Sequence, residues 1–346
     1  MSAAIEGMFL NSELFDHQRG ASNKGYKKID MGTLVLSTQN LHLGNANVNL
    51  RFEHGMVSPA YKTYHIHDCS IELIAEWVKS EKAKRFFYDA TTVGASVCRR
   101  NVEWDTLYDQ PLYLPSAAEQ ERLATFLTSL SARIKKQSEL VEHLKKYKRG
   151  LHKQVFSPKP HWSVKPLRDM ATFCGGGTPS KDVSKYWQGS IGWISSSDVQ
   201  EDWIDEISIS RRITEEAIAN SATKLCPKGT IAIISRVGVG KVAIMPEDLC
   251  TSQDYTNITT IDGDVTFFAY QIAHKMKIEV SKTQGTAIKG VTADTIKSME
   301  MDIPDLHEQR KIATTLQKLD YRIKYEIQLL TLLQNAKRSL LQQLFI

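Results

Sequence analysis

A stretch of 42 residues occurs twice in this chain, and this repeat is the strongest constraint on its fold. The first copy covers residues 115–156 and the second covers 304–345, an offset of 189 residues that needs no gap. Identical residues occupy 17 of the 42 aligned positions. Self-similarity of this length indicates that one structural unit is used twice.

Each copy is predicted to be one long helix. The first has no internal proline or glycine before Gly150, and Ser116 and Glu119 have the spacing of a capping box. Its apolar residues recur at steps of four and three, which is typical of a coiled-coil seam. About 40 residues at ~1.5 Å each give a rod of roughly 60 Å. The residues predicted to pack the two spacer helices together are Leu130, Ile134, Val141, Leu144, Lys148, Leu319, Ile323, Glu326, Leu330 and Leu333.

Polar residues within the seam predict that the two helices pair in opposite directions. An antiparallel pair centred between residues 142 and 143 would bring Lys148 to Glu326 and, at the same time, Gln137 to Lys337. Polar seam residues of this kind fix the register of a coiled coil at some cost in stability. We therefore expect an antiparallel pair with these two contacts.

The two helices divide the chain into two mixed α/β domains, so the predicted fold class is α+β with an internal pseudo-twofold repeat. The predicted segments are domains at 1–114 and 158–303 and spacer helices at 115–157 and 304–346. The unit that ends at residue 156 is 34 residues shorter than the 190-residue unit that follows it (190 − 156 = 34). No counterpart of the glycine-rich loop at 175–180 occurs in the first unit. The first domain is therefore expected to lack its front part.

Bulk composition excludes several classes of protein. The net charge of +5 is compatible with a polyanionic partner without requiring one. Five scattered cysteines without a CxxC pair indicate neither a disulfide framework nor a cysteine zinc site. No apolar run is long enough to span a membrane, and the N-terminus lacks a signal-peptide pattern. These features predict a cytoplasmic protein with no membrane association.

Stretches that resemble catalytic or metal sites lack part of the required pattern. Residues 175–178 have three glycines but not the lysine of a phosphate-binding P-loop. His65 and His67 share one face of a predicted strand without further metal ligands. Asp305 and Glu308 are placed as a helix cap, since Ser116 replaces Asp305 in the first copy. The prediction is therefore no catalytic residue, no metal and no cofactor.

Basic and polar side chains are better placed for binding than for catalysis. Lysines and arginines crowd the first helix, where a solvated helix face and contact with phosphates are both open interpretations. Loops of the two domains carry Asn, Gln, Ser, Arg and Lys beside aromatic residues. Such side chains read base edges, with Arg or Lys binding guanine and Asn or Gln binding adenine.

The order of several motifs, together with the duplicated helix, resembles the specificity (S) subunit of type I restriction-modification systems. The motifs are Gly176-Gly177-Thr178-Pro179-Ser180, Tyr186-Trp187, Ile191-x-Trp193-Ile194-Ser195-Ser196-x-Asp198, Pro227-Lys228-Gly229, Ser235-Arg236 with Gly240-Lys241, and Pro304-x-x-x-Glu308-Gln309. Gly55 to Tyr61 looks like the interior of a recognition domain in this family. The resemblance covers nearly the whole chain.

The resemblance implies a non-catalytic subunit that recognises DNA. Two target-recognition domains would each read half of a bipartite double-stranded target, and the helices would set the spacer between the halves. The subunit would hold methyltransferase (M) subunits and, through them, restriction (R) subunits on the site. One alternative is a truncated or split subunit that acts mainly as a helical assembly scaffold or as a half-site reader. An independent enzyme is disfavoured because no catalytic set is present.

The shortened first domain begins part-way through the family pattern. A natural truncation, a remainder encoded elsewhere, and a silent or split cassette are all compatible with this. The residues predicted to contact DNA lie in polar loops. They are Arg19, Gln39, Asn40 and Arg51 in the first domain, and Thr178, Ser180, Lys181, Ser196, Arg236, Lys241 and Gln253 in the second.

Overall fold

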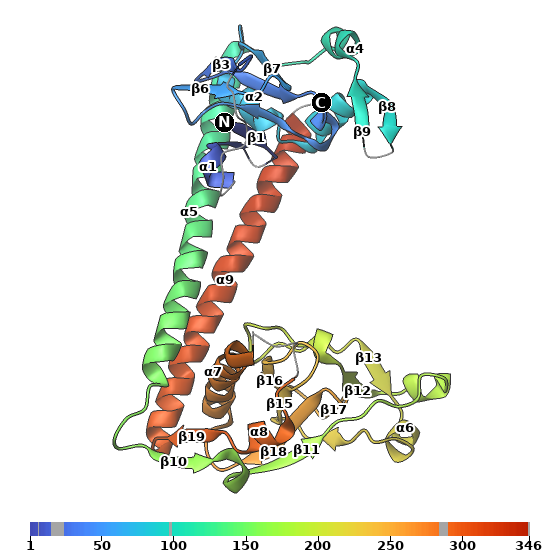
Figure 1. The fold of residues 1–346 in the computed structure, drawn as a ribbon, viewed down its shortest axis with the longest axis vertical. Helices are drawn as coiled ribbons and strands as arrows, with labels where there is room; N and C mark the ends of the chain where they lie inside the picture. The colour runs from blue at the N-terminus through green and yellow to red at the C-terminus, as the bar shows by residue number, and fades with distance from the viewer. Residues whose placement is uncertain (6, 15–23, 97–98, 284–289, 345–346) are drawn as a thin grey trace. The chain divides into compact units, whose positions relative to one another are not determined.

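The chain folds into two compact units, each containing part of both long helices (Figure 1). The computed structural model describes residues 1–5, 7–14, 24–96, 99–283 and 290–344. The first unit is Met1–Val141 with Glu326–Ile346, and the second is Glu142–Tyr325. The units therefore divide within the helices, whereas the sequence places the domain boundaries at the helix ends.

The two copies of the repeat form the helices α5 (Ala117–Val155) and α9 (Leu306–Leu344), each 39 residues long. Both begin in the same way. Gln120 Nε2 donates to the Pro115 carbonyl at 3.0 Å, and Gln309 Nε2 donates to the Pro304 carbonyl at 2.9 Å. These glutamines occupy equivalent positions of the repeat, so the sequence identity preserves one way of starting the helix.

The predicted cap of the second helix is also present. The Glu308 amide donates to Asp305 Oδ1 at 2.8 Å, as expected when an acidic side chain accepts from a free amide at a helix start. Glu308 itself binds Lys159 Nζ at 2.9 Å and Trp162 Nε1 at 3.0 Å. Asp305 and Glu308 are therefore occupied in capping and packing.

The helices pair antiparallel, as the sequence predicts, but the predicted register is wrong. Gln137 Nε2 lies 2.5 Å from Glu326 Oε2, and Lys148 Nζ lies 2.6 Å from Asp320 Oδ1. Lys337 pairs with Glu76 at 2.5 Å and donates to Ser131 Oγ at 2.7 Å. Lys148 therefore does not meet Glu326, and Gln137 does not meet Lys337. Lys337 is bound by Glu76, and Asp320 accepts a hydrogen bond from Tyr270 at 2.8 Å. Glu76 and Tyr270 lie outside the two long helices, so the seam pattern could not reveal them.

Short strands and helices make up the rest of the first unit. They are β1 (Ser2–Ala4), β2 (Gly7–Phe9), α1 (Asn11–Leu14), β3 (Lys27–Asp30), β4 (Leu34–Ser37), η1 (Leu41–Leu43), β5 (Ala46–Val48), β6 (His54–Val57), β7 (Tyr61–Tyr64), α2 (Ile71–Trp77), α3 (Glu81–Asp89), β8 (Thr91–Ser96), β9 (Arg99–Val102) and α4 (Trp104–Asp109). The largest sheet has the antiparallel order β5-β4-β7. Its core joins Leu36 and Trp77 to Leu127 of α5 and Leu341 of α9.

A stretch of the first unit with helical apolar spacing forms two helices instead of one. The periodicity favours a helix over residues 71–84, but α2 ends at Trp77 and α3 begins at Glu81. The Ser80 side chain accepts from the Ala83 amide and caps the second helix. A serine that offers its oxygen to a nearby amide competes with continuing helix, which accounts for the break.

The second unit contains two four-stranded sheets with orders β11-β18-β15-β16 and β13-β12-β17-β14. Its elements are β10 (Ser163–Pro166), η2 (Leu167–Asp169), β11 (Ala171–Gly175), η3 (Ser184–Trp187), β12 (Ile191–Ile194), η4 (Ser196–Asp198), β13 (Arg211–Ile213), α6 (Glu215–Ala219), β14 (Leu225–Cys226), β15 (Ile231–Ile234), β16 (Val242–Ile244), β17 (Leu249–Thr251), β18 (Tyr255–Ile261), α7 (Val265–Thr283), α8 (Ala293–Lys297) and β19 (Glu300–Ile303). β12 runs parallel to β17, and the other paired strands of the two sheets run antiparallel.

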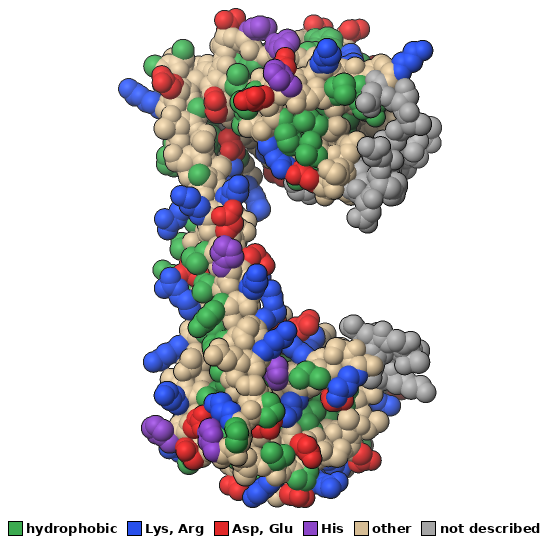
Figure 2. Space-filling view, turned by 60° about the vertical axis from the view of Figure 1, so that its left-hand side comes forward, with side chains coloured by type: hydrophobic (Ala, Val, Ile, Leu, Met, Phe, Trp, Pro, Cys, Tyr) green, Lys and Arg blue, Asp and Glu red, His purple; other side chains and the backbone are tan. Residues whose placement is uncertain are grey.

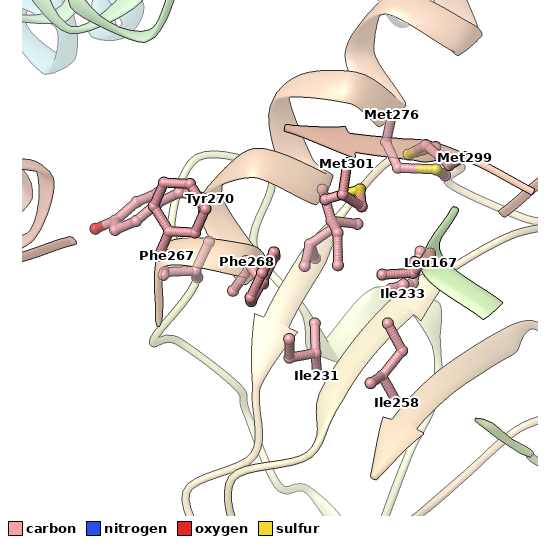
Figure 3. Packing of buried hydrophobic residues seen from close by; sticks show 14 of the residues in the cluster. Leu167, Ile231, Ile233, Ile258, Phe267, Phe268, Tyr270, Met276, Met299 and Met301 are labelled. Atoms are coloured by element: carbon pink, nitrogen blue, oxygen red, sulfur yellow. The ribbon is translucent and has the colours of Figure 1, made fainter. Parts of the chain in front are cut away.

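The helix α7 packs its apolar face on the β15–β18 sheet. Figure 3 shows Phe268 facing Ile231 of β15, and Ile258 of β18 and Met301 of β19 belong to the same cluster. The Tyr270 hydroxyl points out of this cluster (Figure 3), and it bonds to Asp320 of α9. Burial of these side chains removes apolar surface from water and stabilises the unit. The same contacts fix the sheet against α9.

Candidate nucleic-acid interface

Four polar loops meet at one edge of the second unit. They follow β11, β12, β15 and β17, at residues 176–180, 195–198, 235–241 and 252–254. Backbone hydrogen bonds join them: Gly177 N to the Thr251 carbonyl at 2.8 Å, Ser252 N to the Ile194 carbonyl at 2.9 Å, and Ser235 N to the Asp254 carbonyl at 2.8 Å. Six of the seven residues predicted to contact DNA in the second domain lie in these loops, and the seventh, Lys181, directly follows the loop at 176–180.

The first contact between predicted residues joins Thr178 and Gln253. Thr178 Oγ1 donates to Gln253 Oε1 at 2.5 Å, and the exposed Gln253 side chain keeps its NH₂ group for another partner. Trp193 Nε1 donates to the Gly177 carbonyl at 2.9 Å and holds the loop in place. A Cβ atom at Gly177 would lie 2.4 Å from Thr223 N, so only glycine fits this approach.

The second contact joins Ser196 and Lys241. Lys241 Nζ donates to the carbonyl oxygens of Ser196 at 3.3 Å and Val199 at 3.0 Å. The half-buried lysine thus ties the β15–β16 loop to the loop after β12. Arg236 and Lys181 are exposed, and no described carboxylate forms an ion pair with either of them. Their charges therefore face solvent, while Lys241 acts as a brace.

Arg211 of β13 is a central residue of this cluster that the sequence prediction missed. Its guanidinium forms an ion pair with Asp198, donates to Ser195 Oγ at 2.6 Å, and lies 4.7 Å from the centre of the Trp193 ring. Asp198 is 8% exposed, so it needs such a partner. Only the pairing of β13 with β12 brings Arg211 to this loop. The signal in the sequence was weak, because two arginines on a short strand are common.

A buried tyrosine supports the same loop from below. Tyr255 Oη donates to the Ser195 carbonyl at 2.7 Å. Burial raises the pKa of Tyr255 well above its ordinary value, and the nearby carboxylates of Asp198 and Asp254 raise it further. The hydroxyl therefore stays protonated and serves as a fixed donor to the loop.

In the first unit, the predicted DNA contacts are not gathered in this way. Arg51 binds Glu13 with both guanidinium nitrogens, at 2.9 and 2.5 Å. The hydrogen bond from Arg51 lowers the pKa of the Glu13 carboxyl below its ordinary value. Gln39 and Asn40 are exposed after β4, and the described hydrogen bonds do not connect them with Arg51. Arg19 lies outside the described residues.

The loop cluster sits within the part of the chain that matches a known family. The profile of the type I restriction modification DNA specificity domain matches residues 160–335, which is 176 of the 346 residues. The chain belongs to this family.

Two known proteins are similar to about half of this chain. It is 34% identical over 191 residues to the type I restriction enzyme MjaIX specificity subunit of Methanocaldococcus jannaschii, which covers 54% of this chain and 44% of that protein. It is 30% identical over 164 residues to the EcoR124I/EcoR124II specificity subunit of Escherichia coli, which covers 45% of this chain and 40% of that protein. The chain thus spans less than half the length of each relative.

Solved structures share the fold of this specificity-domain chain over most of its length. The S subunit of a type I restriction-modification system from M. genitalium has a TM-score of 0.60 at 14% identity, covering 94% of this chain and 87% of that one. The HsdS subunit from Thermoanaerobacter tengcongensis has a TM-score of 0.51 at 15% identity, covering 94% and 83%. At these identities the likeness shows the fold alone.

All ten residues predicted to pack the spacer helices are buried or half-buried. Val141, Ile323 and Glu326 are buried. The other seven are half-buried: Leu130, Ile134, Leu144, Lys148, Leu319, Leu330 and Leu333. The apolar seam therefore faces inward, although two of its polar members have partners other than the predicted ones.

The described residues contain neither a metal-site candidate nor a membrane-spanning helix. No group of three or more His, Cys, Asp or Glu side chains among them could hold a metal ion. The rings of His65 and His67 lie 6.3 Å apart, centre to centre. None of the described helices is both long and apolar enough to cross a membrane.

Proposed function

We propose that this chain is the DNA sequence-specificity subunit of a type I restriction-modification complex. In this role it reads a bipartite double-stranded target, docks the M subunits and, through them, the R subunits, and catalyses no reaction itself. The observation that carries the proposal is the convergence of four polar loops on one edge of the second unit, in a chain that also has a duplicated long helix. Such a complex would act on DNA in the cytoplasm.

The loop cluster supports a division between reading and bracing. Gln253 and Arg236 present an amide group and a guanidinium that form no ion pair or hydrogen bond with the described residues through their NH groups, and these are the groups that pair with adenine and guanine edges. Ser180 and Lys181 extend the same surface beside Thr178. Lys241, Arg211 and Tyr255 hold the loops through carbonyl, carboxylate and hydroxyl groups, so the reading side chains start from fixed positions.

The proposed domain plan follows the helices. Residues 1–114 and 158–303 would be the recognition domains, and residues 115–157 and 304–346 the spacer helices. Polar, exposed side chains on the outer faces of α5 and α9 leave a surface on which M subunits can pack. The helix pair would then combine two tasks, spacing the half-sites and holding the methyltransferase.

The test uses the chain assembled with its M subunits. Methylated positions are mapped in cells that carry both, and duplexes with one or both half-sites are compared in binding assays. Methylation at a split sequence and tight binding only to the duplex with both halves are the expected results. Assembly with M subunits but no sequence preference in either assay would reject the DNA-reading role.

A half-site reader is the second candidate, and one observation favours it. Arg51, the one described arginine predicted to read DNA in the first unit, is held by Glu13. If only the second domain reads DNA, duplexes with one half-site would bind as tightly as duplexes with both. Changing the first half-site then has no effect on affinity, which separates this candidate from the full bipartite reader.

A further inference from the structure

A cavity of about 300 Å³ lies within the second unit, between α5, α7 and the segment 201–204. Its apolar lining includes Ile204, Val242 and Ile323. Its rim is basic, with five cationic side chains: Lys145, Lys148, Arg149, Lys153 and Lys277. The lining carboxylates are Glu201 and Asp202, so the lining residues carry a net charge of +3 with neutral histidines (5 − 2 = +3).

Three of these cations form a line along α5. Lys145, Arg149 and Lys153 are spaced by four residues, so they share one face of the helix and follow each other at ~6 Å intervals. Like charges at this spacing destabilise a helix by about 0.2–0.5 kcal/mol per pair. Figure 2 shows Lys and Arg side chains exposed along the long helices. An anion that lies against the row would relieve this repulsion.

The row is incompletely neutralised within the unit. Lys148 is used inside the protein, where it binds Asp320 at 2.6 Å. Lys145 forms an exposed pair with Glu142 at 3.2 Å, and Lys277 lies 3.8 Å from Asp202. Exposed ion pairs of this kind contribute little to stability, so they neutralise these cations only weakly. No described carboxylate forms an ion pair with Arg149 or Lys153, so both charges face solvent.

Two histidines, His152 and His274, line the cavity. Burial, then Lys148, His274 and Lys277, lower the pKa of His152 to about 3. Burial, then Lys275, Lys277 and Lys153, lower the pKa of His274. The groups that face the two rings are thus cationic or apolar, with Tyr270 and Phe156 in ring contact. The nearby cations add to burial in disfavouring the charged form of both rings.

The repeat shows that helix packing does not require this charge. The positions that correspond to Lys145, Arg149 and Lys153 in the second copy are Gln334, Arg338 and Gln342. Two of the three charges are therefore absent where the same helix pattern packs in the first unit. The additional lysines of α5 have no role in the shared architecture.

The cavity adjoins one of the candidate DNA-reading loops. Val242 of β16 lines it, and the β15–β16 loop that carries Arg236 precedes this strand. A Cβ atom at Gly240 of that loop would lie 3.3 Å from Val280 of α7, next to Ile278 and Ser281 in the cavity wall. A duplex read by Arg236 would thus continue toward α5.

Building on the proposed function, we infer that Lys145, Arg149, Lys153 and Lys277 form a phosphate-binding row for the DNA backbone that flanks the half-site read by the second domain. The row anchors DNA without reading its sequence, because phosphates carry no base identity. Each phosphate contact also releases counterions, which makes binding sensitive to salt.

The test replaces Lys145 and Lys153 by the residues of the second copy, in the double variant K145Q/K153Q. The control is K136Q/K146N, which removes two exposed lysines of α5 that do not line the cavity. Binding of a cognate duplex to the complex with M subunits is measured between 50 and 300 mM salt. The cavity variant should reduce the salt slope by about 1.8, which is ~0.9 per lost contact, and weaken binding about tenfold for cognate and unrelated duplexes alike. The control should leave the slope unchanged.

Duplexes with neutral methylphosphonates on one flank of the half-site complete the test. Neutralising the contacted flank should weaken wild-type binding, and the cavity variant should lose nothing further on that duplex. An unchanged salt slope in K145Q/K153Q, or additive losses with every methylphosphonate duplex, would overturn the phosphate row. A wild-type complex that binds no duplex specifically would instead reject the proposed DNA-reading function.

A measurement without substitution guards against misfolded variants. The pKa of His274 is followed by NMR of histidine-labelled full-length chain, with and without duplex. Phosphates beside Lys153 and Lys277 should raise this pKa, because a nearby negative charge favours the imidazolium form. An unchanged pKa of His274 at saturating DNA would argue against the row.

Discussion

Lys148 Nζ lies 2.6 Å from Asp320 Oδ1, and the corresponding residues of the other repeat copy, Lys337 and Ser131, are joined at 2.7 Å. The two pairs occupy equivalent positions of the repeat, so the same contact is used once in each unit. Gln137 and Glu326, which touch, are also equivalent positions of the repeat, so the pairing is centred near residue 137 of the first copy and not between residues 142 and 143. A single pair of polar positions, used twice, therefore fixes how the helices meet.

Replacing Lys148 by alanine should destabilise the second unit. Asp320 is 3% exposed and would be left as a buried carboxylate with only Tyr270 as a partner. Removing one member of such a pair costs about 3–5 kcal/mol. Urea denaturation at pH 7 measures the free energy of unfolding, with Lys145→Ala as the control for losing one lysine from the same helix. A loss below ~1 kcal/mol for Lys148→Ala would show that the pair does not hold the register.

The same variant should be less destabilised in acid. Burial raises the pKa of Asp320 in the folded chain, so the protonated form contributes stability at low pH that is lost as pH rises through this pKa. Without Lys148 the pKa rises further, and the neutral acid avoids the cost of a buried charge. The difference in unfolding free energy between wild type and Lys148→Ala should therefore shrink between pH 7 and pH 4. A constant difference would contradict this account.

His152 should make folding stability fall with acid. Its pKa is about 3 in the folded chain, below the ordinary value, so the unfolded chain binds a proton first as pH falls below 6.5. Stability present above pH 6.5 is then lost at up to about 1.4 kcal/mol per pH unit. His152→Leu, which takes the residue of the second copy (Leu341), should flatten this slope between pH 6.5 and 4.5. Equal slopes in denaturation series of the two proteins would exclude His152 as the cause.

Arg211→Ala should loosen the loop after β12 and weaken DNA binding. The variant leaves Asp198 without its guanidinium partner and removes the donor to Ser195. We expect an affinity loss of about tenfold for the cognate half-site, or ~1.4 kcal/mol, with assembly to M subunits intact. Arg212→Ala is the control, since its exposed side chain contacts the Ser190 carbonyl at 2.6 Å and Glu247 at 3.7 Å, and no described contact joins it to Asp198. Similar losses in both variants would assign the effect to net charge.

Arg236→Ala should remove sequence discrimination at one position of the half-site. Its guanidinium has no described carboxylate partner and lies in the loop cluster, so a bidentate contact with guanine would contribute about 1–3 kcal/mol. Binding to a set of duplexes with single base changes measures the loss. Lys228→Ala, at the opposite end of β15, should leave discrimination unchanged. Unchanged discrimination in Arg236→Ala would take this residue out of the reading surface.

Local patterns accounted for much of the fold. The cap at Asp305, the long uninterrupted helices and the strand at Ile231–Ile234 all follow from hydrogen bonding and periodicity within a few residues. The glycine-rich stretch from Arg236 to Lys241 is a loop, as its composition indicates. The meeting of the loops follows less directly, because it depends on strand pairings such as β12 with β17.

Other features depended on contacts between distant residues. Arg211 reaches Asp198 only through the β12–β13 pairing, and Ser80 ends a helix whose apolar spacing continues past it. Lys241 is predicted from the sequence to contact DNA, yet its ammonium group donates to two backbone carbonyl groups. None of these partners is within reach of a short-range pattern.

The sequence by itself determined that this chain has two copies of a long helix, because the apolar seam and the caps are local signals. Only the tertiary structure decided the register. Asp320 is buried beside Tyr270, and Lys337 is bound by Glu76, and both partners come from outside the helices. A buried charge must find its counterion, and this requirement outweighs the small differences in apolar packing between neighbouring registers.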